Sequence, residues 1–110
     1  MTVNVRIDGG ICGFSTLVTA EGGAHYEASF RLDSQCPNWQ KVNDILGGQP
    51  LNMMTELFKN RETGRLESRI LETALTRIPH VSCPVISGLL KAMEVSVGLA
   101  LPKDASIRFQ

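Results

Sequence analysis

The sequence is poor in aromatic residues and carries no excess charge of either sign. Aromatic side chains make up 5% of the 110 residues, so an aliphatic core is expected. Lys plus Arg and Asp plus Glu number 11 each, which gives a formal net charge of zero, and no three basic residues are adjacent. Nucleic-acid binding depends on clustered cations that contact phosphates. We therefore expect no nucleic-acid partner.

Long apolar segments are also missing. No apolar run approaches the roughly 20 residues that a membrane-spanning helix needs. Residues 1–8 alternate between apolar and polar side chains, and so lack the continuous apolar segment of a signal peptide. These absences predict a cytoplasmic protein with no membrane partner.

The familiar catalytic and phosphate-binding motifs do not occur. The sequence contains no G-x-x-x-x-G-K-[ST], G-x-G-x-x-G, H-E-x-x-H or G-x-S-x-G. The two histidines, His25 and His80, are the only imidazoles that could activate a nucleophile. The sequence therefore does not decide whether the protein is an enzyme.

The apolar pattern predicts a single α+β domain over residues 1–110. Alternation predicts antiparallel strands over residues 2–8, 14–20 and 25–33, with Tyr26 facing inward, and a short last strand over 105–109. Helical spacing predicts helices over residues 37–46, 50–60, 65–78 and 84–97. The expected architecture has two layers, a mostly antiparallel β-meander with helices packed on one face.

Three cysteines, Cys12, Cys36 and Cys83, are the candidate functional residues. An odd number cannot pair completely within one chain, and a reducing compartment keeps thiols free. Cys36 and Cys83 each precede a proline that opens a predicted helix, which places both at N-caps. Ser, Thr, Asn and Asp are the preferred caps, so a cysteine at this position suggests that the thiol itself is needed. A helix N-terminus stabilises a thiolate, the form that binds metals and attacks electrophiles.

The pattern of these residues is compatible with a metal site. Cys12 lies in a glycine-rich turn, where Gly13 allows a close approach of backbone or cofactor. Thiolates of Cys12, Cys36 and Cys83, with His80 as a fourth ligand, would suit zinc or an iron–sulfur cluster. The spacing matches no C-x-x-C knuckle or ferredoxin motif, so the sequence does not name the metal.

Two other interpretations remain open. In the first, Cys83 or Cys36 is the nucleophile of a thiol-redox or cysteine-dependent enzyme, and Cys12 resolves it as a disulfide. In the second, the cysteines are packed small hydrophobic residues of a metal-free interaction domain. A protein partner or a homo-oligomer is compatible with all three interpretations.

The cysteine segments also resemble a small protein family. Ile11-Cys12-Gly13-Phe14, Cys36-Pro37 and the segment from Cys83-Pro84-Val85 to Pro102 are similar to a family of three-cysteine domains with no assigned activity. The resemblance covers nearly the whole chain, and members of this family are associated with anaerobic microbes. It implies that the three cysteines belong to a family pattern and that oxygen-sensitive thiolates or clusters are plausible; His80 has no place in that pattern.

Overall fold

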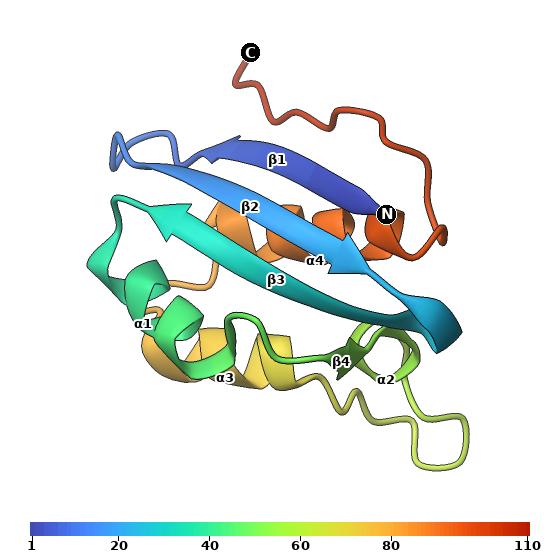
Figure 1. The fold of residues 1–110 in the computed structure, drawn as a ribbon. Coiled ribbons are helices and arrows are strands. Elements are labelled where there is room, and N and C mark those ends of the chain that lie inside the picture. Colours follow the sequence, from blue (N-terminus) through green and yellow to red (C-terminus); the bar gives the residue numbers. More distant parts are fainter.

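The chain begins with an antiparallel sheet whose strands follow the alternation in the sequence. In the computed structural model, which describes residues 1–110, β1 spans Thr2–Asp8, β2 Ser15–Gly22 and β3 Glu27–Ser34. A two-residue strand, β4 (Leu51–Asn52), completes the sheet in the order β1-β2-β3-β4, with every pair antiparallel. Strand β1 therefore pairs only with β2 and has one open edge (Figure 1).

Four helices cover one face of this sheet (Figure 1). They are α1 (Pro37–Leu46), α2 (Met53–Leu57), α3 (Arg69–Arg77) and α4 (Pro84–Ser96). Helix α4 lies against β1 and β2, α1 lies against β3, and α3 packs on α1. The predicted class, a mostly antiparallel meander with helices on one face, is confirmed. The longest helix, α4, has 13 residues, and none of the helices has the length and apolar character needed to cross a membrane.

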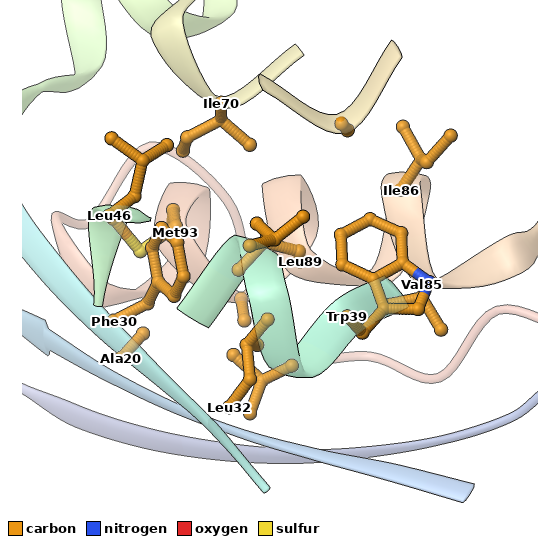
Figure 2. Packing of buried hydrophobic residues seen from close by; sticks show 14 of the residues in the cluster. Ala20, Phe30, Leu32, Trp39, Leu46, Ile70, Val85, Ile86, Leu89 and Met93 are labelled. Carbon is orange, nitrogen blue, oxygen red and sulfur yellow. The ribbon is translucent and has the colours of Figure 1, made fainter. Parts of the chain in front are cut away.

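The core lies between the sheet and the helices and is mainly aliphatic. It comprises one cluster of 19 buried hydrophobic residues, in which Trp39 is the largest side chain and is 1% exposed. Figure 2 shows the indole of Trp39 at the start of α4, and Leu89 and Met93 farther along that helix. Helix α4 sits so close to β1 that a Cβ at Gly88 would collide with the side chain of Ile7. The close fit holds the second turn of α4 against the end of β1.

Two predicted helices begin later than expected because polar side chains cap them inside an apolar pattern. The helix expected over 50–60 begins only at Met53, since Asn52 caps it by accepting a hydrogen bond from the Met54 N–H, and it ends at Leu57. The helix expected over 65–78 begins only at Arg69, since Ser68 accepts a hydrogen bond from the Leu71 N–H as its N-cap. Apolar spacing continues through both boundaries and does not reveal them.

Two other predictions are wrong in conformation. His25 and Tyr26 have φ angles of 58° and 60° in a short 3-10 turn (Ala24–Tyr26), so the third strand starts at Glu27. Tyr26 is 46% exposed rather than inward-facing. The strand expected over 105–109 is absent, and its apolar side chains are exposed, Ile107 by 81% and Phe109 by 100%. In both places the side chains alternate, but the residues pair with no strand of the chain.

Candidate thiolate site

The three cysteines lie in connections toward one end of the molecule. Cys12 lies in the β1–β2 turn, Cys36 between β3 and α1, and Cys83 between α3 and α4. All three connections lie at the left in Figure 1. Three segments that are far apart in the sequence therefore lie toward the same end of the molecule.

Hydrogen bonds tie the segments of Cys12 and Cys36 to each other. The backbone N–H of Ser15, just after the Cys12 turn, donates to Oε1 of Gln35 at 2.9 Å. The backbone N–H of Gln35 donates in return to the carbonyl oxygen of Ser15 at 3.3 Å. Ser34 Oγ then accepts from the N–H of Cys36 at 3.1 Å. The backbone at Cys36 is thus held to the sheet beside the turn that carries Cys12.

The capping positions of Cys36 and Cys83 are confirmed, but neither thiol caps its helix. Both residues are N-caps followed by proline, and neither side chain accepts a hydrogen bond from the first turn. In the same chain, Asn52 and Ser68 use their side-chain oxygens to cap α2 and α3. Side-chain oxygens therefore cap α2 and α3, whereas α1 and α4, which begin after cysteines, have no side-chain cap. Capping does not explain the two cysteines.

The thiol of Cys83 makes one hydrogen bond, which comes from a core residue. Nε1 of Trp39 donates a hydrogen bond to Sγ of Cys83 at 3.4 Å. Trp39 is in the first turn of α1, three residues after Cys36, so this ring connects the N-terminal turns of α1 and α4. Cys36 and Cys83 are both half-buried and pack against the core. An N–H donor directed at sulfur suits a thiol, a thiolate or a metal-bound sulfur alike.

Cys12 and His80 are in a different situation, since both are exposed. The Cys12 turn contains Gly10 and Gly13 with φ angles of 80° and 73°, a conformation that favours glycine. Its thiol is turned toward Gly9, where an added Cβ would lie 2.5 Å from Sγ. His80 lies in the turn before Cys83, and its side chain makes no hydrogen bond within the chain.

The four predicted ligands do not form an assembled site. All three cysteines are free, and no group of three or more His, Cys, Asp or Glu side chains is placed to hold a metal ion. The segments that carry the cysteines lie toward one end of the molecule, but the sulfur atoms do not form a coordination sphere.

Asp8 is the carboxylate at the end of β1, before the Cys12 turn. Hydrogen bonds from Ser15 Oγ at 2.8 Å and from Arg6 Nε at 3.2 Å, together with the Arg6 charge, lower the pKa of Asp8 below its ordinary value of 3.8. This carboxylate is thus held on the exposed face of the sheet by its own strand and by β2. We assign it no role as a ligand.

A hollow on the surface lies away from the cysteines. It has a volume of about 400 Å³ and lies on the outer face of the sheet, lined by Thr19, Glu21, Ser29, Phe30, Arg31 and Gly48. It contains no cysteine or histidine and is widely open. The chemistry at the cysteine-bearing end is the stronger indicator of function.

Sequence reasoning missed one buried ionisable residue, Glu56, which is 2% exposed. Its Oε1 accepts hydrogen bonds from Ser68 Oγ at 3.1 Å and from the Ile70 N–H at 2.8 Å, and its Oε2 accepts from the Arg69 N–H at 3.0 Å. The carboxylate thus satisfies the first N–H groups of α3 and neutralises their positive end. Its position three residues after buried Met53 was the available signal. Its role is structural.

These features define a small α+β domain with three free thiols carried at one end of its sheet. The chain belongs to a family of unknown function, DUF6951, whose model matches residues 3–109 and therefore includes all three cysteines. No protein of curated function and no solved structure matches the chain. The expected membership of a family without an assigned activity is confirmed.

Proposed function

We propose that the domain binds a thiophilic metal, zinc or an iron–sulfur cluster, through the thiolates of Cys36, Cys83 and Cys12. The observation that carries this proposal is that two half-buried cysteines occupy the N-caps of neighbouring helices without capping them. The positive N-terminal end of a helix stabilises a thiolate, and neither sulfur is engaged in a capping hydrogen bond.

Cys36 and Cys83 would be the fixed ligands, because hydrogen bonds to the rigid part of the fold hold the backbone beside Cys36 and the thiol of Cys83. Cys36 follows the Gln35–Ser15 hydrogen bonds, and Cys83 receives the Trp39 N–H. Such contacts to ligating side chains typically orient them for a metal. Cys12 would be the third ligand, delivered when the glycine-containing turn closes over the pair. His80, three residues before Cys83, is the candidate for the fourth position.

Zinc prefers four ligands in a tetrahedral arrangement, and iron–sulfur clusters are held by thiolates, so both fit a three-cysteine set with one further ligand or an open position. A redox or cofactor-handling role would use the cluster or the open position, whereas a structural role would use a closed zinc site. Free thiols suit a reducing compartment, and we place this activity in the cytoplasm.

Cobalt titration of metal-free protein under anaerobic conditions tests the proposal. Thiolate ligation gives Co²⁺ a sulfur-to-metal charge-transfer band, and zinc should displace the cobalt and remove the band. We expect Cys36→Ser and Cys83→Ser to abolish the band and Cys12→Ser to weaken it. His80→Gln should alter the ligand field, and His25→Gln, the other exposed histidine, should leave the spectrum unchanged. A native protein that gives no band would contradict the proposal.

A second candidate function, thiol chemistry at Cys83, is favoured by the Trp39 hydrogen bond to its sulfur. In this alternative the N–H group and the start of α4 stabilise the Cys83 thiolate. A peroxide would oxidise this thiolate to a sulfenic acid, and the Cys12 thiol would then displace water to form the disulfide. Alkylation of metal-free protein, followed site by site with mass spectrometry, distinguishes the candidates. Faster modification of half-buried Cys83 than of exposed Cys12 would support the nucleophile, and the reverse order would count against it.

A further inference from the structure

Strand β1 is an edge without a partner. It pairs with β2 on one side, and the backbone N–H and C=O groups on its other side bond to nothing in the chain. Neither Pro nor Lys occurs in β1, and its two charged residues, Arg6 and Asp8, pair with each other. On the helix-covered face, Val3 and Val5 pack against the core but are only partly buried. A strand added here would cover both the edge and these side chains.

The C-terminal tail, residues 101–110, is a strand-like segment without a sheet. Ala105, Ile107 and Phe109 alternate with polar residues, and the two larger side chains are almost fully exposed. The one backbone hydrogen bond within the tail joins the Lys103 N–H to the Leu101 carbonyl at 2.9 Å, and none joins the tail to β1. The family match extends through residue 109, so the tail belongs to the family's domain.

The fold disfavours pairing of the tail with β1 of the same chain. Helix α4 ends beside the start of β1 (Figure 1). Gly22 connects the two, because it lies against the carbonyl of Ser96 and the Gly22 N–H donates to the Met1 carbonyl at 3.0 Å. A tail that leaves from this end could run beside its own β1 only in the parallel direction. To pair in the antiparallel direction, the tail would first have to reach the far end of β1 and then turn back. The six residue steps from Leu99 to Ala105 span at most about 20 Å, roughly the length of β1, so no residues are left to make that turn.

Parallel pairing at an open edge is a poor solution for this sheet. Parallel strands occur mainly where helices cover both faces, whereas the outer face of this sheet is uncovered (Figure 1). Antiparallel ladders tolerate one exposed face and are slightly more stable per residue. A tail from another molecule has no restriction on its direction.

We propose that the tail of one chain adds as an antiparallel strand to the β1 edge of a second copy. The alternation then places Ile107 and Phe109 on the helix-covered face, where Val3 and Val5 of the second copy are partly open. Ser106 and Arg108 lie on the polar face. Reciprocal exchange of two tails gives a closed twofold dimer in which neither molecule retains an open β1 edge.

Mass measurement by size-exclusion chromatography with light scattering tests this dimer. The full chain should have twice its mass of 12.0 kDa. A chain that ends at Pro102, and the double variant Ile107→Ser/Phe109→Ser, should have the monomer mass. These changes touch only exposed residues, so the domain should stay folded. The control Ser106→Ala/Arg108→Ala changes the other face of the same segment and should remain dimeric.

Two results would overturn the proposal. One is a full chain that stays monomeric up to high micromolar concentration. The other is a truncated chain that still dimerises, which would mean that the edge pairs without the tail. Hydrogen exchange supplies an independent readout, because β1 amides that point away from β2 should be protected in the full chain and exchange rapidly in the truncated one.

Discussion

Replacement of Glu56 by glutamine tests the claim that a buried carboxylate holds the start of α3. The glutamine carbonyl can still accept from Ser68 Oγ and the Ile70 N–H, which both bond to Oε1. The glutamine NH₂ group would replace Oε2 and face the Arg69 N–H, so two donors would oppose each other. Hydrogen bonds to charged groups contribute about 1.5–3 kcal/mol, and a buried unsatisfied donor costs a similar amount.

We therefore expect Glu56→Gln to lower the free energy of unfolding by about 2–3 kcal/mol. Total stabilities of domains are about 5–15 kcal/mol, so the loss should be plain in urea or thermal unfolding followed by circular dichroism. At roughly 4–8 °C per kcal/mol for a domain of about 100 residues, the midpoint should fall by at least about 8 °C.

Glu72→Gln is the matched control, because Glu72 lies in the first turn of the same helix but is exposed. Its carboxylate interacts with the helix dipole through solvent, which contributes about 0.3–1 kcal/mol. Equal losses for the two variants would refute the reasoning, since burial and direct hydrogen bonds would then add nothing to a surface charge effect.

Three further predictions concern other parts of the fold. Gly88→Ala should destabilise the protein by about 1–3 kcal/mol in thermal unfolding, because its methyl group collides with Ile7, and a neutral effect would contradict the close fit of α4 on β1. Ser68→Ala should cost about 1–2 kcal/mol in urea unfolding through loss of the α3 cap, and an unchanged midpoint would exclude that role. In an NMR titration the pKa of Asp8 should lie below 3.8 and should rise in Ser15→Ala. Because folding lowers this pKa, the small contribution of Asp8 to stability is present above the unfolded-state pKa and is lost as the pH falls through the folded-state pKa. A pKa of Asp8 that does not respond to Ser15→Ala would contradict the assigned cause.

The class of fold could be predicted because alternation and helical spacing agree with the tertiary structure over most of the chain. The strand 2–8 and helix α1 have the predicted bounds, β2 lies within two residues of the strand predicted over 14–20, and α4 is one residue shorter than the helix predicted over 84–97. The errors at Tyr26 and Ser68 fall where a positive φ angle or a polar side chain changes the backbone while the apolar pattern continues. The strand expected over 105–109 is a different error, because its alternating residues pair with no strand of the chain. Apolar periodicity reports which side of an element is buried, and not where the element begins.

The candidate site could be predicted in part. Proline after Cys36 and Cys83 correctly indicated N-caps, since proline is favoured at the first helical position. The sequence could not show whether sulfur atoms from separate connections converge, because side-chain directions depend on tertiary packing. The hydrogen bond from Trp39 to Cys83 and those that Glu56 accepts could not be predicted for the same reason, since each joins residues from different helices.

Metal content of protein purified without oxygen tests the central claim most directly. Elemental analysis and visible absorbance would be measured on the native chain and on Cys36→Ser and Cys83→Ser variants. The proposal predicts near-stoichiometric zinc, or iron with a sulfide-to-iron absorption band, and its loss in both variants. In metal-free protein the serine variants should fold normally, since serine is a good N-cap. A native protein that is folded, colourless and free of metal would contradict the claim.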